Sequence, residues 1–161
     1  MTGTQPDLLK SLSADKADAI LALASRLAVP AGAVLFPLGA NAEHLYVIDR
    51  GRVNLTLPME VYGREEDILV EERSAGQTVG WSALIPPHRF TLKATAQIDT
   101  DLFAFPRGTL QDYLAAHPEV GFQVMTNLAA TVGQRLQVFQ AMWLREMKRG
   151  IEMSGAAGSR A

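Results

Sequence analysis

The sequence predicts a mainly β fold with flanking helices, and three observations support this class. Short β-branched or alternating runs occupy residues 34–105 and are separated by glycine, proline and acidic turns. Apolar residues at helical spacing lie on both sides of this block. The chain has 161 residues, of which 48% are hydrophobic, which is enough for one core and too little for two ordinary domains. We therefore expect one domain over residues 1–153, with a β-sandwich or barrel over about residues 30–106.

The N-terminal segment has the spacing of a helix. Ser13 is placed to cap its longer part, and Pro30 and Gly32 are placed to end it. We expect a short helical piece followed by a helix that ends before Pro30. The apolar positions are Leu8, Leu9, Leu12, Ala17, Ile20, Leu21, Ala24 and Leu27.

The expected strands are short runs between turn residues. They read VLF, HLYVID, RVNLTL, DILVEE, FTLKATA and DLFAF. The stretch VIDRGRVNL predicts a hairpin with its turn at residues 49–51, because Gly51 is able to adopt positive φ. The stretch PMEVYGREED, residues 58–67, predicts a longer polar hairpin loop by the same reasoning.

Two helices are expected after the strands. Residues 109–116 form a short amphipathic piece, and Pro118 opens a long helix that reaches about Met153. The apolar positions of the long helix repeat by four and three, which is typical of a helix that packs against another helix. They are Met125, Ala129, Val132, Leu136, Phe139, Trp143 and Met147. Residues 154–161 are small and polar and are expected to be a flexible tail.

The same apolar face can pack against the β block of its own chain or against a second copy. A helix of about 35 residues is roughly 50 Å long, which is more than a small β domain covers. We therefore expect part of this helix to form a homodimer with two-fold symmetry.

Composition excludes several classes of function. Fifteen lysines and arginines against 17 aspartates and glutamates give a net charge of −2, with no basic run of the kind that nucleic acid attracts. The absence of cysteine excludes disulfides, thiolate metal sites and cysteine nucleophiles. No signal core or membrane-length apolar run is visible, so we expect no membrane association and a cytoplasmic location.

The stretch GQTVGWSALIPPHRFTLKATA carries the candidate site. Gly80 lets the backbone approach a ligand, and one helical turn after it directs amide N–H groups outward. Two prolines end this turn and stiffen the connection to Arg89, whose guanidinium then faces the amides. This pattern indicates a phosphate site. The alternative is that Arg89 is an ordinary surface arginine and Gly80 an ordinary turn residue.

The runs PAGAVLFPLGANAEHLYVIDRGRVNL, AGQTVGWSALI and R-x-T-L-K-A-T-A resemble the cyclic-nucleotide-binding domain family over about residues 10–150. The family's ordered glycines are matched by Gly32, Gly39, Gly51, Gly76 and Gly80. The resemblance implies a double-stranded β-helix, or jelly roll, flanked by helices, which holds a cyclic nucleotide phosphate between the short turn and the arginine. It further implies that the phosphate cassette consists of Gly80, Ser82, Ala83 and Arg89.

The sequence departs from the family pattern at the ribose and phosphate contacts. Trp81 replaces the glutamate that accepts the ribose 2′-hydroxyl, and Phe90 stands where a small residue follows the arginine. The segment from glycine to arginine is also one residue shorter than the commonest pattern. Losing one charge-assisted hydrogen bond lowers affinity about ten- to a hundredfold. The candidate base or ribose contacts are Trp81, Phe90, Thr91 and Gln140.

The segment QRLQVFQ, residues 134–140, resembles the part of the family's long helix that reaches the purine from the same or the partner subunit. Gln140 is suited to hydrogen-bond a base edge, whereas Phe139 is suited to the core of a dimer seam. The family's transcription factors carry a helix-turn-helix domain after this helix. No recognition helix follows here, so direct DNA binding by this chain is not expected.

The sequence predicts a stand-alone regulatory module that binds cyclic AMP or cyclic GMP and signals through its long helix to an unidentified effector protein. The alternative is a cyclic-nucleotide fold that has lost its ligand and serves in dimerisation or protein docking. A metalloenzyme of the cupin type is disfavoured, because His44, His88 and His117 are scattered. Ser82 has no evident histidine and acid partners, so we expect no enzyme activity, no catalytic cofactor and no metal.

Overall fold

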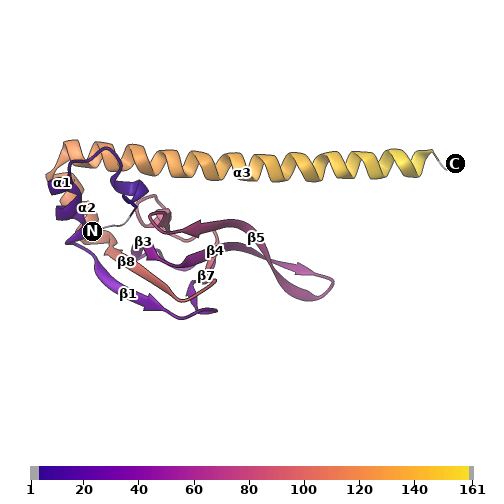
Figure 1. Ribbon diagram of the computed structural model, residues 1–161. Helices are drawn as coiled ribbons and strands as arrows, with labels where there is room; N and C mark the ends of the chain where they lie inside the picture. The colour runs from indigo at the N-terminus through magenta and orange to yellow at the C-terminus, as the bar shows by residue number, and fades with distance from the viewer. Residues whose placement is uncertain (1–3, 160–161) are drawn as a thin grey trace. The chain divides into compact units, whose positions relative to one another are not determined.

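The computed structural model describes residues 4–159 (Figure 1). They belong to two compact units, of which the first ends at Ala129 and the second begins at Ala130. The first unit contains two four-stranded sheets in which every strand pair is antiparallel. The mainly β class with flanking helices is therefore confirmed.

One sheet has the strand order β1-β8-β3-β6. Its strands are β1 (Ser25–Val29), β8 (Thr100–Pro106), β3 (His44–Arg50) and β6 (Thr78–Val79). The other sheet has the order β2-β7-β4-β5. Its strands are β2 (Val34–Phe36), β7 (Lys93–Ala96), β4 (Arg52–Val61) and β5 (Arg64–Ser74). Neighbouring strands are mostly not consecutive in sequence, so the chain passes repeatedly from one sheet to the other.

Short helical segments lie before, within and after the strands. They are η1 (Asp7–Leu9), α1 (Ala14–Leu21), η2 (Trp81–Ala83), α2 (Arg107–Ala116) and the start of α3 (Pro118–Gly158). The Ser13 hydroxyl accepts a hydrogen bond from the Lys16 amide at 3.4 Å, which confirms the predicted cap. Apolar side chains from both sheets form the core, among them Leu45, Val47, Val53, Leu55, Leu102 and Phe105.

The prediction that the N-terminal helix continues towards residue 28 is wrong, because α1 ends at Leu21 and Ser25–Val29 is strand β1. β1 pairs along its whole length with β8. Arg26 donates a hydrogen bond to Asp49 at 2.6 Å, and its guanidinium lies 4.6 Å from the centroid of the Phe103 ring. Pairing with a strand about 75 residues away in sequence outweighs the local helical spacing.

The predicted hairpin at residues 49–51 is also wrong, because β3 and β4 lie in different sheets. Gly51 carries the chain across with a φ of +109°, and a Cβ atom there would lie 2.7 Å from Thr100 Cα. The Thr100 hydroxyl accepts a hydrogen bond from the Arg52 amide at 3.1 Å. Glycine is therefore needed for both its positive φ and its small size.

The polar loop expected over residues 58–67 is replaced by strand. β4 continues to Val61 and β5 begins at Arg64, so only Tyr62 and Gly63 form the turn. Both have positive φ, 50° and 75°, as a two-residue hairpin turn requires. Figure 1 shows the paired β4 and β5 extending beyond the other strands of their sheet.

Three element boundaries also differ from the expectation. The strand expected from Phe90 begins only at Lys93, and the two-residue strand β6 was not predicted. Helix α3 begins at Pro118 as expected, but it continues to Gly158. Residues 154–158 of the expected tail are therefore helical, and Ser154 donates its hydroxyl to the Gly150 carbonyl at 2.9 Å. The last two residues of the expected tail lie outside the described residues.

We expect Gly51→Ala to lower the free energy of unfolding by about 2 kcal/mol more than Gly63→Ala does. Both glycines have positive φ, so both variants lose about 1 kcal/mol from backbone strain. Only the Gly51 variant also meets a neighbouring backbone, since nothing lies within 4 Å of a Cβ at Gly63. Urea unfolding measures both free energies, and equal losses would show that the crossing at Gly51 has room for a side chain.

Candidate functional site

Gly80 opens the candidate site in a left-handed conformation, with φ +79° and ψ 39°. It caps the 3₁₀ turn η2, in which the Ala83 amide donates to the Gly80 carbonyl at 3.1 Å. The first amides of such a turn, those of Trp81 and Ser82, have no carbonyl partner within it. Gly80 and η2 therefore form the backbone amide group that the sequence predicts.

The proline loop after the turn is fastened to the Ser82 carbonyl. This carbonyl accepts hydrogen bonds from the Ile85 amide at 3.2 Å and from Nδ1 of His88 at 3.3 Å. The His88 amide in turn donates to the Ile85 carbonyl at 3.0 Å, and the Pro86–Pro87 peptide bond is cis. The loop is therefore a compact connection between η2 and Arg89.

Arg89 lies at the surface with its guanidinium turned to the segment between β2 and β3. Its Nη1 donates to the Gly39 carbonyl at 3.1 Å, and its backbone forms an isolated antiparallel bridge with Asn41. Phe90 continues this pairing, since its amide donates to the Ala40 carbonyl at 3.0 Å and its carbonyl accepts from the Gly39 amide at 2.8 Å. The guanidinium is thus held at the carbonyl of Gly39, a glycine that belongs to the same sequence pattern.

Three aromatic rings surround the α-carbon of Gly80. The Phe90 and Phe36 side chains are buried, at 6% and 5% exposure, and their rings stack with centroids 3.6 Å apart. The Tyr46 ring lies 6.1 Å beyond Phe36. A Cβ atom on Gly80 would lie 3.0 Å from Phe90 Cε1, 3.4 Å from Phe36 Cε1 and 3.5 Å from Tyr46 Cδ2. The space next to the glycine is therefore filled by side chains of this chain.

Tyr46 is the one titratable group of the described residues for which a pKa shift is resolved at this site. Burial raises the pKa of its phenol, and the negative charge of Glu43 raises it further. The phenol consequently stays protonated at neutral pH and keeps a hydroxyl donor beside the aromatic cluster.

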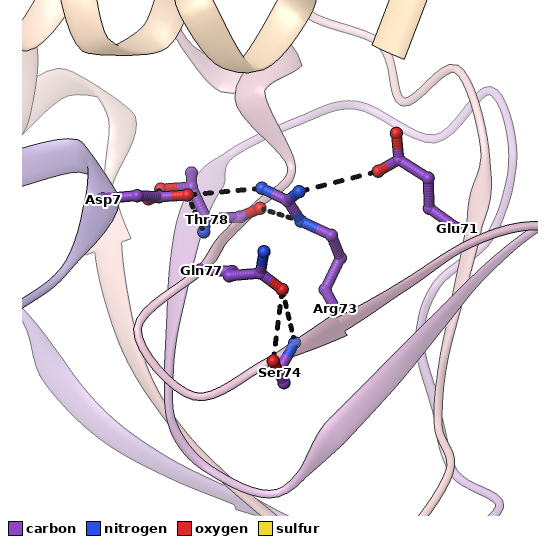
Figure 2. Close-up of polar contacts among 6 residues, drawn as sticks. All are labelled: Asp7, Glu71, Arg73, Ser74, Gln77 and Thr78. Atoms are coloured by element: carbon purple, nitrogen blue, oxygen red, sulfur yellow. Dashed lines mark hydrogen bonds and ion pairs between the residues drawn. The ribbon is translucent and has the colours of Figure 1, made fainter. Parts of the chain in front are cut away.

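A buried ionic network holds the strand that leads into Gly80 (Figure 2). The Arg73 guanidinium lies between the carboxylates of Asp7, at 3.3 Å, and Glu71, at 3.7 Å. Arg73 Nε also donates to the Thr78 carbonyl at 3.3 Å. Asp7 accepts from the Thr78 amide at 3.2 Å and from the Thr78 hydroxyl. The backbone and hydroxyl groups of Thr78 are therefore all bonded to Asp7 or Arg73.

The turn before Thr78 is closed by Gln77, whose side-chain carbonyl accepts from the Ser74 amide at 2.8 Å and from the Ser74 hydroxyl at 3.3 Å (Figure 2). Asp7 also donates its backbone amide to the Gly76 carbonyl at 2.8 Å. The N-terminal segment thus fixes residues 76–78, two residues before Gly80. Sequence analysis missed this network, because its partners are distant in sequence and no local pattern joins them.

The structure brings together five of the predicted site residues. Gly80, Trp81, Ser82 and Ala83 share the turn, with Ser82 and Ala83 buried, and Phe90 packs on Gly80. Trp81 is partly buried, and Thr91 is exposed. Gln140 belongs to the second unit, in which it is an exposed residue of α3. Phe36 and Tyr46 were not predicted, although their aromatic character on strands beside glycine turns was a usable signal.

Within residues 4–159, no group of three or more histidine, cysteine, aspartate or glutamate side chains is placed to hold a metal ion. In the same residues, no helix is both long enough and apolar enough to cross a membrane.

The two-sheet roll, with a left-handed glycine before a short turn and an arginine loop after it, defines a β-roll domain. Residues 26–117 match the family model described as the cyclic nucleotide-binding domain, which is more than half of the chain. The chain belongs to this family. The match confirms the resemblance seen in the sequence and the jelly-roll fold.

Similar proteins include glutaminase 1 of Bradyrhizobium diazoefficiens, which is 27% identical over 134 residues. The alignment covers 83% of this chain and only 21% of the glutaminase, so the chain spans about a fifth of that protein. The Thermus thermophilus catabolite activator protein has a TM-score of 0.71 and 25% identity, over 88% of this chain and 63% of that chain. The N-terminal domain of a Streptomyces coelicolor transcriptional regulator has a TM-score of 0.69 and 24% identity, over 85% and 94%.

We expect Asp7→Asn to lower the free energy of unfolding by about 2 kcal/mol, because the buried Arg73 guanidinium and Thr78 lose a charged acceptor. Asp112→Asn, which changes an exposed carboxylate on α2, is the matched control and should stay within about 0.5 kcal/mol. Chemical denaturation measures both. Equal effects of the two variants would mean that the network contributes nothing to stability.

We expect the free energy of unfolding to fall as the pH rises above about 10, in part through Tyr46. The raised pKa keeps this phenol protonated in the folded state, while the unfolded chain releases the proton near the ordinary value of 10.0. Tyr46→Phe should therefore show a shallower loss of stability than the parent, and Tyr62→Phe, at a fully exposed position, should not. Denaturant titrations at about pH 8 and about pH 10.5 make the comparison. Parallel behaviour of both variants would exclude a contribution from Tyr46.

Proposed function

We propose that this chain is a regulatory module that binds a cyclic nucleotide, cyclic AMP or cyclic GMP, at the turn after Gly80. Membership of the cyclic nucleotide-binding domain family supports this function. The observation that carries it is the left-handed Gly80 followed by η2, whose first amides are suited to donate hydrogen bonds to a phosphate oxygen. Gly80, Ser82 and Ala83 supply the backbone of this phosphate cassette, and Arg89 supplies the opposing positive charge.

The remainder of the nucleotide has fewer partners than in a typical site. No residue of Trp81–Ile85 carries a carboxylate to accept the ribose hydroxyl, so binding depends mainly on the phosphate. Trp81 and Thr91 are the candidate contacts to base or ribose from this part of the chain, and Gln140 is the candidate from α3. We therefore expect weaker binding than a complete cassette provides.

The output is proposed to pass through α3 in a homodimer. Large apolar side chains of the second unit are exposed, among them Leu136, Trp143, Leu144, Met147 and Ile151. Their burial against a second copy is the simplest use of such a face. A regulatory role without catalysis fits this family, and the effector protein that reads the dimer is a separate partner. No direct DNA binding by this chain is proposed.

A second candidate function is a fold that no longer binds nucleotide and serves in dimerisation or protein docking. The observation that favours it is the Phe36 and Phe90 stack, which fills the space beside Gly80. The Phe36 and Phe90 stack would stay beside Gly80 in the docking function, whereas it would have to make room for a nucleotide in the sensing function.

We expect calorimetric titration with cyclic AMP or cyclic GMP to give saturable binding that Arg89→Ala weakens at least tenfold, because the phosphate loses a charge-assisted donor. Arg64→Ala, at the exposed start of β5, is the control and should bind like the parent. Titrations with adenosine and guanosine 5′-monophosphates test whether binding requires the phosphate to be cyclic. Absence of saturable heat with both cyclic nucleotides would reject the sensing function and leave the docking function.

A further inference from the structure

The Phe90 side chain packs directly against Gly80, the residue that opens the short turn η2. Its ring comes within 3.0 Å of the position of a Cβ on Gly80, and it is stacked on Phe36 along nearly parallel planes, 10° apart. Ser82 and Ala83 are buried with it. The side of Gly80 on which a Cβ atom would lie is therefore covered by an aromatic ring of the chain itself.

We propose that Phe90 is a displaceable plug of the phosphate cassette, and that a cyclic nucleoside monophosphate binds by driving its ring away from Gly80. This inference rests on the proposed function and specifies how its site opens. The plugged and the liganded states exclude each other, because a phosphate oxygen bonded to the amides after Gly80 must lie about 2.9 Å from their nitrogens. The aromatic ring already fills the van der Waals space beside that backbone.

The segment that carries Phe90 is suited to move. Between the proline loop and Lys93, where β7 begins, residues 89–92 form no regular strand. The described backbone bonds of Phe90 are those with Gly39 and Ala40, and Thr91 is exposed. In the proposed movement, this short segment would release its bonds to Gly39 and Ala40 and withdraw the ring, while the strands of both sheets stay paired.

The position of Arg89 couples the plug to the ligand. Neighbouring residues of an extended segment face opposite sides, and here Phe90 faces inward while Arg89 is exposed at the Gly39 carbonyl. A rotation of this segment that brings the guanidinium towards a phosphate on η2 turns the Phe90 ring outward. Charge attraction to the phosphate thus favours the same movement that opens the space for it.

The plug lowers affinity by the fraction of molecules that are open, since only these bind ligand. Shortening the side chain should remove this cost. We expect Phe90→Ala to bind cyclic AMP or cyclic GMP at least tenfold more tightly than the parent. Phe122→Ala, which truncates an exposed phenylalanine, is the matched control and should leave affinity unchanged.

A second measurement does not depend on the folding of a variant. In the parent, the rings of Phe90 and Phe36 should displace the Gly80 Hα resonances from their random-coil positions in the nuclear magnetic resonance spectrum. Saturation with cyclic AMP or cyclic GMP should move them towards random-coil positions as the Phe90 ring leaves. If ligand binds and these resonances keep their displacement, the plug is overturned, whatever becomes of the alanine variant.

The outcomes separate the plug from the proposed function. Binding by the parent with no gain in a folded Phe90→Ala overturns the plug alone and leaves a nucleotide sensor. Binding by Phe90→Ala, strengthened over the parent and abolished by adding Arg89→Ala, supports both. Absence of binding by the parent and by a folded Phe90→Ala overturns the proposed function and the plug together.

Discussion

The buried guanidinium of Arg73 is the interaction on which the candidate site depends. It joins the side-chain carboxylate of Asp7, strand β5 and the Thr78 carbonyl, which are separated by up to 71 residues along the chain. A buried cation is costly unless it is paired and fully hydrogen-bonded, so the three segments are held in one arrangement. Because β6 has only two residues, this network and the pairing with β3 fix the direction in which the chain enters Gly80.

Gly80, whose position is fixed in this way, packs against the aromatic cluster. A Cβ atom at this position would meet three rings, so the glycine serves both the left-handed turn and the close packing of Phe36, Phe90 and Tyr46. The same absence of a side chain that suits a phosphate also suits a ring. In the proposed function, an external anion would therefore compete with an aromatic side chain of the chain for the space beside Gly80.

Local patterns predicted the parts of the fold that carry their own signal. The Ser13 cap, the alternating strand β8 and the start of α3 at Pro118 were found because cap chemistry and periodicity lie within a few residues. β1 was read as helix, since only its pairing with β8 decides its state, and β6 is too short for any period. Gly80 and Arg89 were predictable from their spacing, whereas the Asp7–Arg73 pair and the inward side of Phe90 arise from tertiary packing.

Trp81 and Phe90, two of the departures from the family pattern at this site, are physically consistent with each other. A carboxylate at the partly buried position 81 would lose hydration, which is costly unless the charge gains a partner. Trp81 carries no charge and tolerates partial burial, so it is compatible with the closed state. A ligand that opens this site gains its phosphate contacts but no ribose acceptor, and it must also displace an aromatic stack. A site of the proposed kind would respond only to a ligand whose phosphate contacts contribute more free energy than the aromatic stack does, and this would set a high threshold for sensing.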